Sequence, residues 1–142
     1  MYYDTLIRTK QGVSKVKDLK IGDLVYTENG IQPIRDIQVY TFEQCMEIEF
    51  EDRKRVVCQW DQSFLSNGKW IQAKDIWIRQ DIDDFPISAI IDGEVKDLYI
   101  NKISLFIDCG GINIFVENAN AVLLENGVIT RYPIDQEEDD GN

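Results

Sequence analysis

Apolar and polar positions alternate along most of this chain with the period of a β-strand. The clearest case covers residues 46–50, where Met46, Ile48 and Phe50 are separated by Glu47 and Glu49. Successive side chains of a strand point to opposite faces, so this pattern is typical of a half-buried strand. Further β-rich runs lie at residues 5–9, 23–28, 31–40, 55–58, 63–65, 69–71, 86–91, 94–100, 103–107, 112–116, 121–124 and 128–130.

Turn residues separate these runs. An Asn-Gly or Asp-Gly pair between two apolar runs is the strongest short-range indication of a β-hairpin. Such pairs occur at Asn29-Gly30, Asn67-Gly68, Asp92-Gly93 and Asn126-Gly127. Cys109-Gly110-Gly111 predicts a further break between two strands, and Pro33 predicts an edge or a bulge in the strand that contains it.

Helical spacing is confined to two short segments. Val13, Val16 and Leu19 are spaced as on one helical turn, and residues 72–78 form either a short helix or a loop. We therefore predict an all-β fold of short antiparallel strands and hairpins, with at most one or two short helical turns.

Composition indicates a single domain that folds alone. The chain has 142 residues, and 44% of them are apolar, which is enough for a hydrophobic core. No apolar run reaches the roughly 18 residues of a membrane span. The polar start at residues 1–4 does not match a signal peptide. We expect a cytoplasmic protein, or a component of an assembly built in the cytoplasm, without a membrane partner.

The charge favours protein partners over nucleic acid. The net charge is −11, whereas nucleic-acid-binding proteins usually present a basic face. The one compact basic run, residues 53–55, is expected at a hairpin tip. We predict a β domain over residues 1–132, followed by an acidic C-terminal tail over residues 133–142 that only a partner would order. The candidate contact residues of this tail are Asp135, Glu137, Glu138, Asp139 and Asp140.

The chain contains no histidine, the side chain most often used for acid–base catalysis near neutral pH. We expect no metal ion and no other cofactor. Asp81, Asp83 and Asp84 offer oxygen ligands for Ca²⁺, but they lack the spacing and the closing Glu of an EF-hand. We interpret them as part of a solvated loop.

The three cysteines, Cys45, Cys58 and Cys109, are odd in number and lack the spacing of a disulfide pair or a metal site. We interpret them as buried free thiols. Cys58 is expected to face the core, whereas Cys109, beside two glycines, is better placed for exposure but is also interpreted as a core or loop thiol. Each is also a candidate nucleophile, which would require a lowered pKa and a neighbouring cation or helix N-terminus.

A polar corner between apolar runs, at residues 56–65, is the most conspicuous candidate site. It carries Gln59 and Gln62, whose amides donate hydrogen bonds but do not exchange protons usefully at neutral pH. Trp60, flanked by Gln59 and Asp61, is expected to face the surface and is a candidate contact residue.

Four segments, in order, resemble the Hint fold shared by inteins and Hedgehog autoprocessing domains, over the chain from Tyr3 to about Tyr132. This resemblance implies a Hint-like fold without an inserted endonuclease. It also implies a self-processing centre with a Cys or Ser nucleophile, a Thr-x-x-His pair and a terminal His-Asn pair. The segments are Tyr3–Thr9 with Gly12, Val16–Val25 with its Gly22-Asp23 turn, Val57–Leu65 with Gly68–Trp70 and Ala73–Ile76, and Asn120–Thr130.

The chain departs from the family at each chemical position. The nucleophile would fall just before Met1. Gln59 and Gln62 stand at the positions of the Thr and the His, and Arg131 and Tyr132 stand at the positions of the terminal pair. Ala119 and Asn120 lie near the position of an upstream His. Met1 and Tyr2 cannot replace the nucleophile, and Tyr132 has no carboxamide to cyclise.

Our hypothesis from the sequence is a catalytically inactive Hint-fold module with a structural or protein-interaction role, without a nucleic-acid partner or a small-molecule substrate. By analogy with Hint-like domains of phage and bacterial proteins, a tailed-bacteriophage virion or assembly component is one such role. The alternative is an autoprocessing domain, splicing or self-cleaving, with residual thiol chemistry at Cys58 or Cys109.

Overall fold

The computed structural model describes residues 1–79 and 85–132, except for the side chains of residues 42, 43 and 108. Most of this part of the chain is strand, with one short α-helix, α1, and one 3-10 turn, η1. The elements are β1 Leu6–Thr9, β2 Gly12–Lys15, η1 Val16–Asp18, β3 Leu24–Thr27, β4 Gly30–Phe50, β5 Arg55–Gln59, β6 Ser63–Ser66, β7 Lys69–Gln72, α1 Ala73–Arg79, β8 Pro86–Ile91, β9 Glu94–Val116, β10 Val122–Leu123 and β11 Ile129–Arg131.

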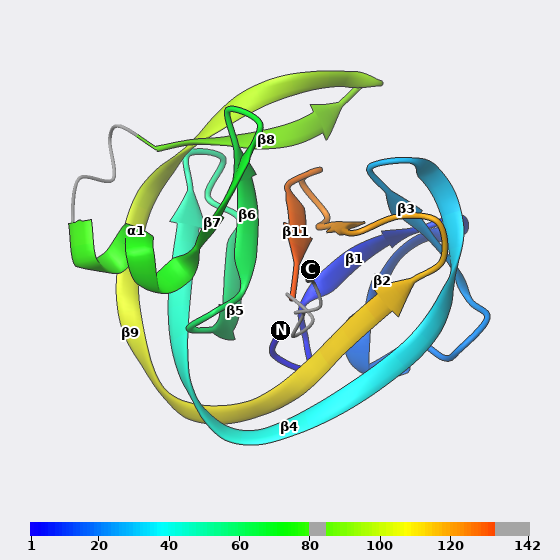
Figure 1. The fold of residues 1–142 in the computed structure, drawn as a ribbon, viewed down its shortest axis with the longest axis horizontal. Helices are drawn as coiled ribbons and strands as arrows, with labels where there is room; N and C mark the ends of the chain where they lie inside the picture. The colour runs from blue at the N-terminus through cyan, green and yellow to red at the C-terminus, as the bar shows by residue number, and fades with distance from the viewer. Residues whose placement is uncertain (80–84, 133–142) are drawn as a thin grey trace, which may run out of the picture.

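Two long antiparallel strands, β4 and β9, form the frame of the molecule. They pair from Ile34 with Val116 to Phe50 with Ile100 and sweep around the other strands (Figure 1). Register shifts interrupt the pairing at several points, including Tyr40 to Cys45. Bulges increase the local twist and bend of a strand pair, which accounts for the curvature of this ribbon.

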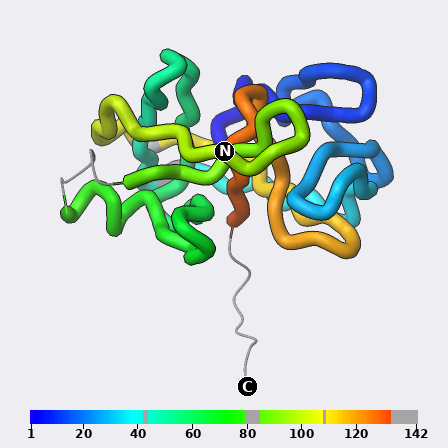
Figure 2. Tube along the Cα trace, turned by 90° about the horizontal axis from the view of Figure 1, so that it is seen from above, coloured from blue at the N-terminus to red at the C-terminus, as the bar shows by residue number. Residues whose placement is uncertain are grey.

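The last hairpin fills the middle of the sheet. Its strand β10 pairs with β3 and its strand β11 pairs with β6, so the sheet order is β7-β6-β11-β10-β3-β4-β9-β8. Both ribbon views place β11 and the N-terminus near the centre of the fold (Figures 1 and 2). The two ends of the described chain therefore meet beside the polar corner.

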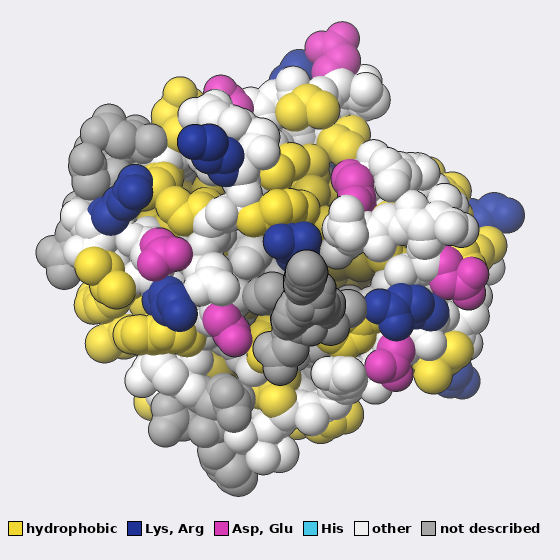
Figure 3. All heavy atoms as spheres, in the orientation of Figure 1, with side chains coloured by type: hydrophobic (Ala, Val, Ile, Leu, Met, Phe, Trp, Pro, Cys, Tyr) yellow, Lys and Arg dark blue, Asp and Glu magenta, His cyan; other side chains and the backbone are white. Residues whose placement is uncertain are grey.

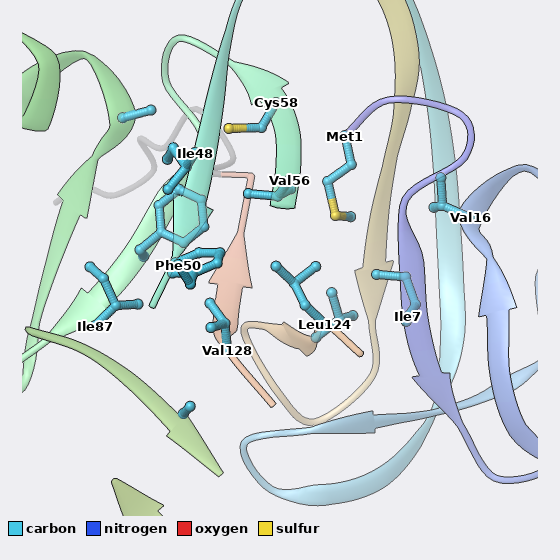
Figure 4. Close-up of a cluster of buried hydrophobic side chains, with 14 of the residues drawn as sticks. Met1, Ile7, Val16, Ile48, Phe50, Val56, Cys58, Ile87, Leu124 and Val128 are labelled. Atoms are coloured by element: carbon cyan, nitrogen blue, oxygen red, sulfur yellow. The ribbon is translucent and has the colours of Figure 1, made fainter. Parts of the chain in front are cut away.

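One main hydrophobic core lies inside the curved sheet. Phe50 and Phe64 meet edge to face within it, with ring centroids 6.4 Å apart. Figure 4 shows the Met1 side chain between Val56 on one side and Ile7 and Val16 on the other. Met1 is 2% exposed, so the first residue of the chain is part of the core.

The all-β prediction is confirmed, and the hairpin turns fall where the sequence placed them. Asn67 and Asp92 have φ values of 51° and 53°, each followed by a glycine with positive φ, as the tight hairpin turn requires. The undecided segment at residues 72–78 is helical, as α1. Val13 belongs to β2, so the predicted helical turn is reduced to η1.

The predicted breaks within β9 were wrong. Neither residues 101–102 nor the Gly110-Gly111 pair divides the chain into separate strands, because β9 runs through both. A Cβ on Gly111 would lie 2.2 Å from the Met1 carbonyl oxygen, and a Cβ on Gly110 would lie 2.8 Å from the Tyr3 hydroxyl. These glycines allow the N-terminal residues to pack closely on a continuous strand.

Candidate functional site

The polar corner is a turn between β5 and β6, closed by backbone hydrogen bonds. The Gln62 N–H donates to the Gln59 carbonyl, at 3.0 Å. The first residues of α1 hold the corner from outside, because the Ala73 N–H donates to the Gln62 carbonyl and the Lys74 N–H to the Trp60 carbonyl, both at 2.9 Å. The corner is therefore a fixed part of the fold.

Gln59 is connected to the N-terminus through a side chain of β9. The Asn113 Nδ2 donates to the Gln59 Oε1 at 2.8 Å, and both side chains are buried. The Met1 ammonium donates to the Ile112 carbonyl at 3.0 Å and to the Asn113 Oδ1 at 3.4 Å. The Ile112 N–H in turn donates to the Met1 carbonyl at 2.8 Å. Burial lowers the pKa of this amino group to about 6.

Gln62 is fully buried on the other side of the corner. Its Nε2 donates to the Thr130 hydroxyl at 2.8 Å, and that hydroxyl donates to the Ser63 carbonyl at 2.8 Å. The Gln62 Oε1 has no hydrogen-bond partner among the described residues. This amide joins β6 to β11 and is not positioned to transfer a proton.

The final described residues close the corner near the surface. The Tyr132 hydroxyl donates to the Asp61 carboxylate at 3.3 Å. The Arg131 guanidinium lies over the Trp70 ring, 4.3 Å from its centroid, and burial lowers the pKa of Arg131. Tyr132 therefore contacts the corner, whereas Arg131 contacts β7.

Ala119 and Asn120 follow the end of β9 at Val116. Ala119 packs against the main core. The N–H groups of Asn120 and Ala121 donate to the Glu28 carboxylate at 2.7 and 2.9 Å, beside the β3–β4 turn.

The sequence analysis missed two residues that form hydrogen bonds with the corner glutamines, Asn113 and Thr130. Asn113 is the one polar residue in the apolar run from Ile112 to Val116, and this interruption was the available signal. Thr130 carried no such signal, because threonine is ordinary in a strand.

Neither Cys58 nor Cys45 has the lowered pKa that a catalytic nucleophile requires. Cys58 faces the main core, as predicted, and burial raises its pKa to about 12. Burial, with the neighbouring Cys109, also raises the pKa of Cys45 to about 12. Cys109 is only 8% exposed, because the N-terminal residues pack on this part of β9, so all three cysteines are buried, as predicted.

A surface pocket of about 380 Å³ opens beside the corner. Gln44, Gln59, Trp60 and Asp61 line it. Trp60 is half-buried, with part of its ring packed on the core and part facing the pocket. On the face shown in Figure 3, acidic and basic side chains are interspersed, and no continuous basic patch forms.

Two groups of predicted positions lie outside the described residues. They are the acids of the 81–84 loop, Asp81, Asp83 and Asp84, and the acids of the tail, Asp135, Glu137, Glu138, Asp139 and Asp140. Of the helices in the described ranges, none has the length and apolarity needed to cross a membrane.

The fold is that of inteins. A DnaB intein from Synechocystis sp. PCC 6803 matches with a TM-score of 0.83 and 12% identity over 94% of this chain and 98% of that one. The MchDnaB-1 intein matches with a TM-score of 0.78 and 17% identity over 93% and 98% of the two chains. The gp41-1 intein matches with a TM-score of 0.74 and 18% identity over 92% and 95%.

No protein-family model matches the chain. No curated protein matches it either. The structural matches show that this chain is a Hint-fold domain, the fold of the self-splicing inteins, over nearly its whole described length. The predicted Hint-like fold is therefore confirmed.

Proposed function

We propose that this chain is a Hint-fold protein-interaction module whose polar corner stabilises the fold and does not cleave or splice the chain. The observation that carries the proposal is the state of Gln59 and Gln62. Both amides lie in the polar corner and are buried. Gln59 forms a hydrogen bond of 2.8 Å with Asn113 of β9, and Gln62 forms one of 2.8 Å with Thr130 of β11. Self-processing needs a nucleophile and a proton donor at such a centre.

Two groups near the corner are unsuited to act as the nucleophile. The Met1 side chain is a thioether, which does not attack a carbonyl. The nearby thiol of Cys58 is buried and has a pKa of about 12, so it is almost wholly protonated at neutral pH.

A binding role is supported by the surface beside the centre. The pocket at Trp60 combines an aromatic ring with the carboxylate of Asp61 and the amide of Gln44, a mixture that suits a protein contact. The acids of the tail extend the negative charge available to a partner. We propose that such a partner lies within a larger assembly, for which a phage virion is one setting.

A second candidate function is self-processing, and one observation favours it. The backbone of Met1 is held from both sides by Ile112, so a peptide bond preceding Met1 would be fixed beside Asn113 and Gln59. Inteins cleave a bond at this end of their chain.

One experiment separates the two functions. The chain is expressed with extra sequence at both ends, and its intact mass is followed over days at neutral pH. We expect no change of mass. Cleavage or ligation that is lost in Cys58→Ala and kept in Cys45→Ala would contradict the proposal and establish the second function.

The binding role is tested with the proteins encoded next to this chain. We expect co-purification with one of them, with cross-links at the Trp60 pocket, and weaker binding by Trp60→Ala. Trp77→Ala, a partly buried tryptophan on α1 outside that pocket, is the matched control. A monomeric chain that binds none of these proteins would count against the interaction role.

A further inference from the structure

A small buried cluster beside the polar corner contains two of the three thiols. Tyr40 and Cys45 on β4 pack against Cys109 on β9, separate from the main core. We propose that Cys45 and Cys109 are an oxidation site, at which a small-molecule disulfide converts the two thiols into a reversible disulfide that cross-links β4 to β9.

The two sulfur atoms are already in contact. Their Sγ atoms lie 2.7 Å apart, and the Cys45 thiol also faces the Cys109 carbonyl at 3.9 Å. The strands are antiparallel neighbours, with Glu43 opposite Cys109 and Cys45 opposite Phe106, so the two cysteines lie on paired strands on either side of a register shift. Forming the bond therefore requires no rearrangement of the strand pairing.

The same distance argues against a shared metal ion. Two thiolates bound to one tetrahedral zinc, at the usual Zn–S distance of about 2.3 Å, lie roughly 3.7 Å from each other. The Cys45 and Cys109 sulfurs are closer than that, and the third side chain of the cluster is a tyrosine. The geometry fits a covalent bond between the sulfurs.

Cys58 is not part of this pair. In the β4–β5 ladder Cys45 lies opposite Gln59, whereas Cys58 lies opposite Met46. Adjacent residues of a strand point to opposite faces, so Cys58 and Cys45 occupy different sides of the ribbon. Cys58 belongs to the main core, which also contains Met1 and Val56.

The reaction begins at Cys109, which is 8% exposed, because Cys45 is wholly buried. The Cys109 thiolate attacks a small disulfide and forms a mixed disulfide, releasing one small thiol. Cys45, after losing its proton, attacks the Cys109 sulfur and displaces the second small thiol. The protein loses two electrons and two protons, and the small disulfide is reduced to two thiols.

The cross-link lies next to the segment of β9 that contacts the N-terminal residues. Gly111, two residues after Cys109, forms a bridge with Tyr2, and the Tyr2 N–H donates to the Val57 carbonyl at 2.8 Å. A disulfide at Cys109 fixes this part of β9 against β4. It should therefore slow hydrogen exchange at the amides of Tyr2 and Ile112, which connect the N-terminus to the sheet.

The test uses the full chain treated with oxidised glutathione and then mapped by mass spectrometry without reduction. We expect the Cys45 and Cys109 peptides to be joined, with a mass lower by two hydrogen atoms, while Cys58 stays free. Dithiothreitol should restore the original mass. We also expect the oxidised chain to melt on the order of 10 °C higher, because the bond closes a long loop.

Three variants sharpen the result. Cys58→Ala should form the same cross-link, whereas Cys45→Ala should stop at a glutathione adduct on Cys109. Cys109→Ala should react at neither remaining thiol. The wild-type map does not depend on any variant folding. An adduct at Cys109 in the wild type without a cross-link, a cross-link that includes Cys58, or three thiols that stay free would each overturn the proposal.

Discussion

The buried amide of Gln62 shows how a polar residue can hold this fold together. Its side chain is 0% exposed and joins β6 to β11 through Thr130. A buried polar group is tolerated when it is hydrogen-bonded, and removing its partner leaves a desolvated group behind. Gln62 therefore contributes through both its hydrogen bond and its packing volume.

We predict that Gln62→Ala lowers the free energy of unfolding by about 2–4 kcal/mol, from the cavity and the lost hydrogen bond. Gln62→Met keeps most of the volume and removes an Oε1 that lacks a partner among the described residues, so it should cost less than about 1.5 kcal/mol. Urea unfolding measures both values.

The exposed Gln38 on β4 is the control, and Gln38→Ala should change the free energy of unfolding by less than about 0.5 kcal/mol. Equal losses for Gln62→Ala and Gln62→Met would show that the hydrogen bond, and not the volume, dominates.

At the scale of elements, the last hairpin depends on one close approach to β8. Gly127 has a φ of 90°, and a Cβ there would lie 2.2 Å from the Ile90 carbonyl oxygen. The Ile90 N–H donates to the Gly127 carbonyl at 2.9 Å, and the Arg8 Nη1 donates to the Ile90 carbonyl at 3.0 Å. The turn is thus both a hairpin tip and a joint between β8, β1 and the last hairpin.

We predict that Gly127→Ala costs about 3 kcal/mol or more, since the added Cβ meets backbone strain and a backbone oxygen together. Gly93→Ala is the matched control, because Gly93 has a φ of 80° and open space around its Cβ position. It should cost only about 1 kcal/mol, the strain alone. Thermal unfolding of both variants tests this, and similar losses would rule out the contact with Ile90 as the cause.

At the scale of the whole molecule, the chain closes around its own N-terminus. The Met1 amino group is buried among groups from β9, and its pKa is lowered to about 6 by that burial. The chain has no histidine, so no other ordinary side chain titrates between pH 6 and 8. Stability in this window therefore reports on the N-terminus of the chain.

We predict that the free energy of unfolding rises by about 2–3 kcal/mol between pH 6 and pH 8. In this range the amino group of the unfolded chain binds a proton that the folded chain does not, so stability increases with pH. Above about pH 9 the trend reverses, because Cys45 and Cys58 keep their protons in the folded chain and lose them in the unfolded one.

Urea unfolding at a series of pH values measures this profile. A chain acetylated at its N-terminus should lose the rise between pH 6 and 8 and keep the fall at high pH. A rise that survives acetylation would assign the effect to another group.

The sequence by itself determined the class of the fold, because its signals are local. Strand periodicity at residues 46–50 and the φ preferences of Asn67-Gly68 and Asp92-Gly93 act within a few residues, and they placed this strand and these two turns correctly. The polar interruption between apolar runs identified Gln59 and Gln62 as members of the corner. The resemblance of four segments to the Hint fold extended this to the arrangement of the whole chain.

Only the tertiary structure decided what surrounds that corner. Asn113 and Thr130 join it from β9 and β11, because these positions depend on how distant strands pair. The contact between Cys45 and Cys109 also depends on a bulge in a long ribbon, which no spacing in the sequence reveals. Pairings between residues far apart in the chain depend on how the whole core packs. For that reason only the tertiary structure could identify the residues that contact the corner from other strands.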